Sequence, residues 1–119
     1  MPGKFTYADL TYLESMSMGA NELIVEMIQL FIDQLPEFKE GLTEHLNKGD
    51  YMALGALAHK AKSSVAVMGM DSLAADLKTL EISAKAGKDQ ELYPILVNRF
   101  IDQVTLTGIE LAAYAKSII

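Results

Sequence analysis

The amino-acid sequence predicts an all-α fold, an antiparallel four-helix bundle preceded by a short accessory helix at the N-terminus. Apolar residues recur every three or four positions along most of the 119 residues, which is the spacing of one helix face. The alternation of apolar and polar residues that marks a strand never persists. Glycine and proline are few and fall mostly where the periodic segments meet. Short joints between long amphipathic helices are typical of antiparallel neighbours in a bundle.

The first two helices are expected in the N-terminal half of the chain. A short one is predicted within residues 7–16. Its inward-facing residues are Leu10 and Leu13. A long one is predicted from a capping Asn21 to about Lys48, and Pro36 is expected to kink it or to weaken one turn. Its apolar stripe comprises Ile24, Met27, Ile28, Phe31, Leu35, Phe38, Leu42 and Leu46.

Three further helices are expected to complete the bundle. The third is predicted from a capping Asp50 to about residue 68. A tight turn leads to the fourth, which is predicted from a capping Asp71 to a stop at Gly87. The fifth is predicted to begin between residues 89 and 94 and to run to the end of the chain. Aspartate at a helix start and glycine just past a helix end are the usual boundary signals.

Composition excludes several classes of function. The chain has no cysteine, so disulfides and thiol chemistry are excluded. A formal net charge of −6 disfavours binding to nucleic acid and to anionic membranes, because like charges repel. No apolar run approaches the ~18 residues that a membrane span needs. We therefore expect one cytoplasmic domain over residues 1–119, with its core bundle over about 21–118 and with no nucleic-acid or membrane partner. A monomer is expected because it is the default state of this bundle architecture.

His59, on the third predicted helix, stands among unusually small side chains. Its neighbours one and two turns away on the same face are Gly55, Ala56, Ser63 and Ala66. A helix surface this bare lets another protein approach the imidazole closely. Lys62, one turn away, is the exception and places a cation near the ring. A helical histidine by itself is usually an ordinary surface or core residue, but this combination favours a functional one.

Glu81, on the fourth predicted helix, is expected at the level of His59. The turn between the two helices pivots near Met70, which lies eleven residues after His59 and eleven before Glu81. Residues equidistant from the turn of an antiparallel hairpin lie at the same height. A carboxylate there would accept a hydrogen bond from the imidazole Nδ1–H and leave Nε2 as the free nucleophile. Lys85, one turn beyond Glu81, is a candidate second cation.

These residues resemble the motif of the histidine phosphotransfer (HPt) family, usually H-x-x-K-G-S-S with a glycine ten positions after the histidine. Here the segment reads His59-Lys60-Ala61-Lys62-Ser63-Ser64, and Gly69, at the tenth position, is counted with the small residues of the docking face. The resemblance extends from about Leu23 to the last helix and implies a four-helix bundle with an accessory helix. Ser63 replaces the usual glycine, and Val65 replaces a second small polar residue. Because serine is still small, we expect docking to survive.

The resemblance implies a phosphoryl carrier and not an enzyme with turnover of its own. His59 would exchange phosphoryl with receiver-domain aspartates in a two-component phosphorelay, Glu81 would orient the imidazole, and Lys62 would offset charge on the phosphoryl oxygens. The implied partners are receiver domains of response regulators and a hybrid sensor histidine kinase. No cofactor or metal is expected in this chain, because Mg²⁺ would be held by the acidic pocket of the receiver.

Two other functional interpretations stay open. The chain can be a helical adaptor that docks without being phosphorylated, or the phosphoacceptor module of a chemotaxis-type kinase. The docking surface also has two interpretations. The stretch from Leu23 to Ile32 is apolar at eight of ten positions, which is wider than a bundle stripe requires. Its surplus residues, Leu23 and Leu30, are either covered by the first helix or presented to the receiver.

Overall fold

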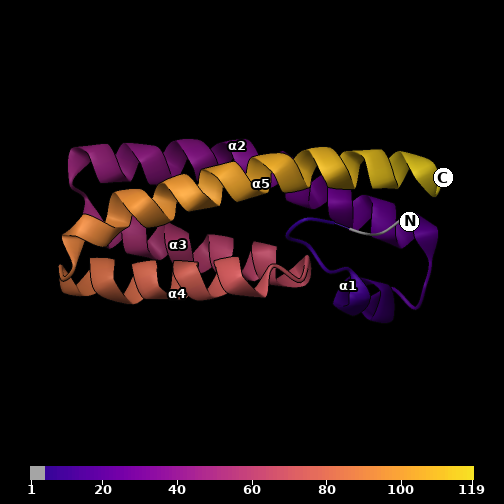
Figure 1. The fold of residues 1–119 in the computed structure, drawn as a ribbon, viewed down its shortest axis with the longest axis horizontal. Coiled ribbons are helices and arrows are strands. Elements are labelled where there is room, and N and C mark those ends of the chain that lie inside the picture. The colour runs from indigo at the N-terminus through magenta and orange to yellow at the C-terminus, as the bar shows by residue number, and fades with distance from the viewer. Residues whose placement is uncertain (1–4) are drawn as a thin grey trace.

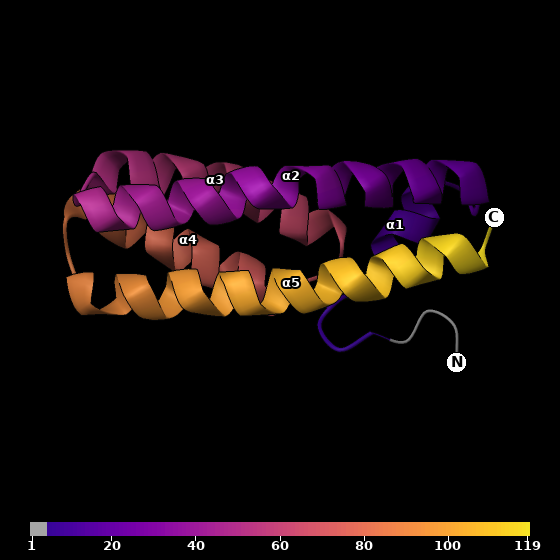
Figure 2. The same cartoon turned by 90° about the horizontal axis from the view of Figure 1, so that it is seen from above.

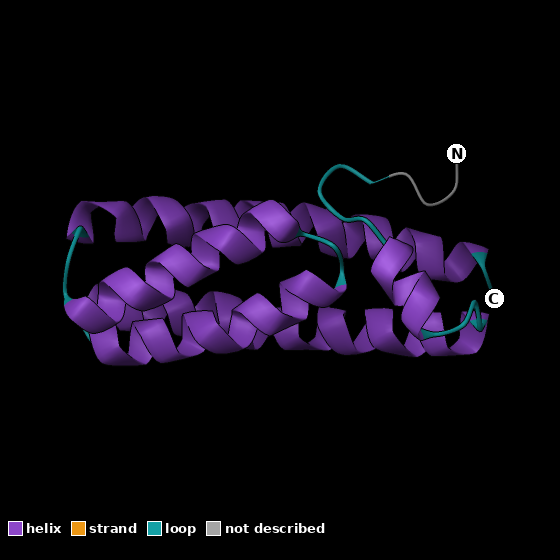
Figure 3. Ribbon diagram, turned by 90° about the horizontal axis from the view of Figure 1, so that it is seen from below, coloured by secondary structure: helices purple, strands orange, loops and turns teal. Residues whose placement is uncertain are grey.

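The computed structural model describes residues 5–119, which form five α-helices and one short 3₁₀ helix in an elongated bundle (Figure 1). The elements are α1 (Thr11–Met16), α2 (Asn21–Lys48), α3 (Tyr51–Val67), α4 (Asp71–Ala86), η1 (Gln90–Leu92) and α5 (Tyr93–Ser117). No strand occurs within this described part of the chain, and Figure 3 shows only helices joined by short loops. The predicted all-α fold class is therefore confirmed.

Helices α2 to α5 form the four-helix bundle, in which each helix contacts the next one along the chain and α5 closes the ring against α2. The molecule measures 44 × 21 × 20 Å along its principal axes. The two long helices, α2 and α5, extend beyond the turn that joins α3 to α4, and α1 lies beside that extension (Figure 1, Figure 2). The accessory helix therefore occupies one end of the bundle, past the shorter α3–α4 hairpin.

The core is a continuous apolar cluster to which all five α-helices contribute. Six residues of the predicted stripe on α2 are buried, whereas Met27 and Leu46 are partly buried at its margins. The largest fully buried side chains are aromatic, namely Tyr93, Phe38 and Phe100. Burial of apolar surface contributes about 25 cal/mol per Å² and is the main force that holds the helices together. One face of α3 enters this core, and its opposite face stays exposed.

Several helix ends follow the predicted boundary signals. Gly49 and Gly87 directly follow α2 and α4 and adopt left-handed φ angles of +69° and +66°. Glycine tolerates this conformation best because it has no Cβ. Asp50 caps α3 as predicted, since its carboxylate accepts a hydrogen bond of 3.2 Å from the amide of Ala53. These local signals place both ends of the α3–α4 hairpin correctly.

The predicted caps at Asn21 and Asp71 are wrong. Both residues are the first residues of their helices, and the capping positions belong to Ala20 and Met70, which make no side-chain capping bond. The side-chain amide of Asn21 instead donates to the carbonyl of Ile118 at 3.1 Å, because the end of α5 lies beside the start of α2. The carboxylate of Asp71 lies in the first turn of α4, where the helix dipole favours a negative charge.

The accessory helix is shorter than the predicted window. It begins at Thr11 because the carboxylate of Asp9 accepts hydrogen bonds from the amide and the hydroxyl of Thr11, at 2.9 and 2.6 Å. Leu10 and Leu13 are buried, as predicted. They attach this short helix to the core through apolar contacts.

The longest helix, α2, runs unbroken through Pro36. The proline has no amide hydrogen, so its structural cost here is one missing hydrogen bond within the helix and not a helix end. No helix within residues 5–119 combines the length and the apolar character that crossing a membrane requires.

Candidate functional site

His59 projects from the outer face of α3, and 61% of its side chain is exposed. The small residues that share this face, Ala56, Ser63 and Ala66, are exposed as well. The opposite side of the helix is buried in the core by apolar residues that include Leu54. The helical period of α3 therefore holds the imidazole at the surface on a rigid element, with little side-chain bulk around it.

Glu81 reaches the imidazole from α4, as the position of the turn predicts. Its Oε2 lies 2.8 Å from Nδ1 of His59, and only 14% of its side chain is exposed. At this distance Nδ1–H donates a hydrogen bond to the carboxylate. The contact sets the orientation of the ring and selects the tautomer in which Nε2, on the far side of the ring, carries the lone pair.

Two lysines contact the same carboxylate. Nζ of Lys62 lies 3.3 Å from Oε1 of Glu81, and Nζ of Lys85 lies 3.1 Å from Oε2. Burial alone would raise the pKa of Glu81, but hydrogen bonds from the lysines and the imidazole outweigh it and lower the pKa to about 2. Glu81 is therefore ionised at neutral pH. Two ammonium groups against one carboxylate leave an excess positive charge beside the exposed imidazole.

Gly55 differs from the expectation that it belongs to an exposed docking face. It is buried under α4. A Cβ atom on Gly55 would lie 2.9 Å from Cγ of Lys85 and 3.0 Å from the carbonyl oxygen of Glu81. The absence of a side chain at this position therefore permits the close approach of α4, the helix that carries the carboxylate and the second lysine.

Gly69 also differs from that expectation. It has a left-handed φ of +70°, and a Cβ atom there would collide with the backbone carbonyl of Asp9. The amide of Asp9 donates to the carbonyl of Met68 at 3.0 Å, so the N-terminal segment lies directly against the α3–α4 turn. Gly69 therefore permits the close approach of the N-terminal segment of this chain, and not that of a partner protein.

Ser63 and Ala66 form part of a hollow between α3 and α1 that the sequence did not reveal. Tyr12 and Ser15 of α1 line the same hollow. The small residues near His59 therefore border the accessory helix as well as open solvent. No sequence signal could have located this neighbour, because the relevant contacts join segments more than forty residues apart.

Leu30 is exposed over 61% of its surface, and Leu23 is exposed too, so α1 does not cover the surplus apolar residues of α2. Leu30 lines a small hollow between α2 and α3, together with Val67 and the polar pair Ser64 and Gln34. The Ser64 hydroxyl donates to the side-chain carbonyl of Gln34 at 2.8 Å. Leu30 therefore presents an exposed apolar side chain beside α3, on the side of that helix that faces α2.

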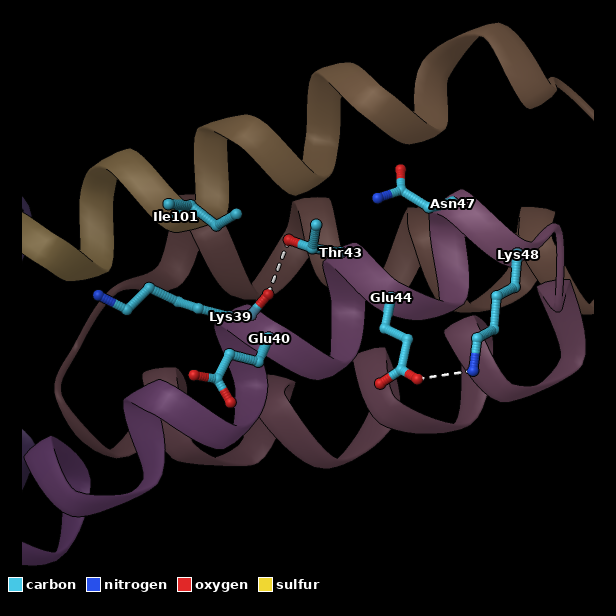
Figure 4. Close-up of a pocket in the computed structure, with 7 residues that line it drawn as sticks. All are labelled: Lys39, Glu40, Thr43, Glu44, Asn47, Lys48 and Ile101. Atoms are coloured by element: carbon cyan, nitrogen blue, oxygen red, sulfur yellow. Dashed lines mark hydrogen bonds and ion pairs between the residues drawn. The ribbon is translucent and has the colours of Figure 1, made fainter.

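A third hollow lies between α2 and α5, and His59 is not among the residues that line it (Figure 4). It is lined by Lys39, Glu40, Thr43, Glu44, Asn47, Lys48 and Ile101. Some of its polar groups bond to one another: Lys48 donates to Glu44 at 2.6 Å, and the Thr43 hydroxyl donates to the carbonyl of Lys39 at 2.8 Å. Within residues 5–119, no three His, Cys, Asp or Glu side chains gather closely enough to hold a metal ion.

Comparisons with known proteins show the family and the fold of the chain. The family model of the Hpt domain matches residues 26–108, a segment that contains His59, Lys62, Glu81 and Lys85. The fold is similar to the crystal structure of histidine-containing phosphotransfer protein B from Pseudomonas aeruginosa PAO1, with a TM-score of 0.73 and 24% identity over 97% of this chain and 93% of that one. No curated protein matches the sequence significantly. Since the Hpt model covers well over half of the sequence, the chain belongs to the family of Hpt domains, the histidine phosphotransfer domains.

Proposed function

We propose that this protein carries a phosphoryl group on Nε2 of His59 and exchanges it with receiver-domain aspartates in a multistep phosphorelay. The observation that carries the proposal is the 2.8 Å contact between Nδ1 of His59 and Glu81, made by an imidazole that is otherwise exposed. In the neutral imidazole, this contact places the proton on Nδ1 and leaves the lone pair of Nε2 accessible, which a nucleophile requires. Family membership supports the same chemistry.

The transfer step follows from the orientation of the ring. Nε2 attacks the phosphorus of an aspartyl phosphate in line with the bond to the aspartate oxygen. The N–P bond forms while the P–O bond breaks, and its electron pair returns to the aspartate carboxylate. The phosphorylated ring keeps its Nδ1 proton and is an imidazolium cation, which the ionised Glu81 stabilises. The reverse reaction passes through the same arrangement, so the protein acts as a carrier without turnover of its own.

Lys62 and Lys85 supply the positive charge that a phosphoryl group needs. Both ammonium groups contact Glu81 when the imidazole is free. A phosphoryl group on Nε2 presents new anionic oxygens near them, and either flexible side chain can turn toward these oxygens while the other stays on the carboxylate. The expected Mg²⁺ belongs to the acidic pocket of the receiver, and we assign no resident metal or cofactor to this chain.

The receiver docks, in this proposal, on the exposed face of α3 and on the neighbouring part of α2. Ala56, Ser63 and Ala66 offer little steric hindrance around His59, and Leu30 supplies exposed apolar surface beside them. Partners of this kind are the receiver domains of response regulators and of a hybrid sensor kinase. We propose that the carrier acts as a monomer in the cytoplasm.

Phosphotransfer from a phosphorylated receiver domain tests the proposal. His59→Gln is compared with wild type and with His45→Gln, a matched change on α2. Wild type and His45→Gln should acquire acid-labile, base-stable phosphate, and His59→Gln should not. If a folded wild-type protein binds receivers but never acquires label, a docking-only adaptor is the better account. If label comes only from a kinase domain with ATP, the protein is a chemotaxis-type phosphoacceptor module.

A further inference from the structure

We propose that Gly55 is a positioning residue, which sets the separation of α3 and α4 at the level of Glu81 and thereby holds the carboxylate on the imidazole of His59. This inference deepens the proposed function and rests on it, because it concerns the group that orients the phosphorylated ring. Gly55 lies four residues before His59, so one turn of α3 separates the glycine from the imidazole.

The contacts at Gly55 are of two kinds. A Cβ atom would lie 2.9 Å from Cγ of Lys85, which is part of a flexible side chain that can turn away. It would also lie 3.0 Å from the carbonyl oxygen of Glu81, which belongs to the backbone of α4. A backbone oxygen inside a helix can move only if the helix moves. A side chain at residue 55 therefore displaces α4 at the residue that contacts His59.

The hydrogen bonds at Glu81 are sensitive to such a displacement. The bond from Nδ1 of His59 is 2.8 Å long, but that from Lys62 is 3.3 Å, close to the limit of a useful hydrogen bond. A shift of α4 by a few tenths of an ångström lengthens the contacts made across the helix pair. The contact with Lys85 lies within α4 and moves with it. The expected result is an imidazole whose tautomer and orientation are less well defined.

Gly41 offers a matched control. It lies on α2 and faces α3 from the other side, and a Cβ atom there would lie 2.5 Å from Cδ2 of Leu57. That atom is the end of a flexible side chain, so the strain is relieved locally and does not reach Glu81. Gly41→Ala and Gly55→Ala both replace a helical glycine by a better helix former where α3 meets a neighbouring helix. Only Gly55→Ala alters the contact between α3 and α4, the helix that carries the carboxylate of Glu81.

The test measures the imidazole directly and then its reactivity. ¹⁵N NMR of His59 reports the tautomer, and phosphorylation by phosphoramidate reports the nucleophile without any docking partner. In that reaction Nε2 attacks phosphorus, the P–N bond of the donor breaks and ammonia leaves. We expect Gly55→Ala to populate the second tautomer and to slow phosphorylation by about tenfold, a change of ~1.4 kcal/mol in the barrier. Gly41→Ala should leave the ratio of the two tautomers and the phosphorylation rate within twofold of wild type.

Unchanged tautomer and rate in a folded Gly55→Ala variant would overturn the inference. If that variant does not fold, Gly55→Ala is made in a Lys85→Ala background and compared with Lys85→Ala alone, since removing the lysine stem leaves only the contact with the carbonyl. A loss of tautomer preference in that pair supports the inference, and no loss refutes it. Failure of the proposed function has a different signature, because wild type would then show the Nδ1–H tautomer but take no phosphoryl group from any donor.

Discussion

Helix α3 meets its two neighbours in different ways. On the α4 side, Gly55 lets the backbones approach, and the charged groups of Glu81 and Lys85 reach the imidazole of His59. On the α2 side, the apolar Leu57 packs over Gly41, and the residues that line the hollow at Leu30 are neutral or apolar. The charged pair on this side, Lys60 and Glu37, is exposed, with 3.6 Å between Nζ and Oε1. The difference indicates a division of roles. In the proposed function, the α4 side determines the chemistry of the imidazole, whereas the α2 side offers the surface on which a receiver docks.

Among changes at the neighbours of His59, the largest effect is expected from Glu81→Ala, which removes the group that orients the ring. Phosphorylation should slow by about thirtyfold, or ~2 kcal/mol, with phosphoramidate and with a phosphorylated receiver alike. Glu81→Gln keeps an acceptor oxygen at the same position and should stay within about fivefold of wild type. Initial rates with both donors check this. A defect confined to the receiver reaction would show that α4 also takes part in docking, and the proposed division would be wrong.

Leu30→Asp tests the α2 side. The change places a charge in the apolar part of the proposed docking surface and should lower kcat/KM for transfer from a receiver by about tenfold, or ~1.4 kcal/mol. The rate with phosphoramidate should not change. Ile109→Asp is the matched control, because Ile109 is 66% exposed on α5 and that helix is packed on α2 and α4 rather than on α3. Equal effects of the two variants would remove the evidence for docking on α2.

Variants of the two lysines test the contribution of positive charge on the α4 side. Lys62→Ala and Lys85→Ala should each slow phosphorylation, by about fivefold and threefold, since each removes one of two cations near the phosphoryl oxygens. The effect of Lys62 is expected to be larger because it is the more buried of the two. The double variant should lose more than the product of the single effects, since either lysine can replace the other. If the rate loss of the double variant equals the product of the two single losses, the lysines do not replace each other.

The last effect concerns stability and not phosphorylation, because the free energy of unfolding should depend on pH. The pKa of Glu81 is lowered to about 2 in the folded protein, from an ordinary value of 4.5. The folded state therefore gains stability from the ionised carboxylate above pH 4.5, and this gain is lost as the pH falls toward 2. It amounts to about 1 kcal/mol once screening by solvent around the exposed partners is included. Urea unfolding of wild type between pH 2 and 7 should show this loss, and Glu81→Gln should lack that part of it.

Part of the site was predictable because it depends on distances along the chain. Lys62 lies one turn after His59 on any regular helix, and Glu81 lies level with His59 because both are eleven residues from Met70. The glycines were not predictable in the same way. A helical glycine shows that space is limited, but the sequence does not say which neighbour fills that space. For Gly55 the neighbour is α4, and for Gly69 it is the N-terminal segment.

The sequence by itself determined the helices, most of their ends and the core, because helical periodicity and boundary residues act over a few positions. It also determined that His59 lies on an outer face of α3. Only the tertiary structure decided that both lysines contact one carboxylate, that Gly55 is buried, and that Leu30 is exposed. The physical reason is that the distance between two helices depends on every side chain packed between them. Those side chains come from segments that are far apart in the sequence.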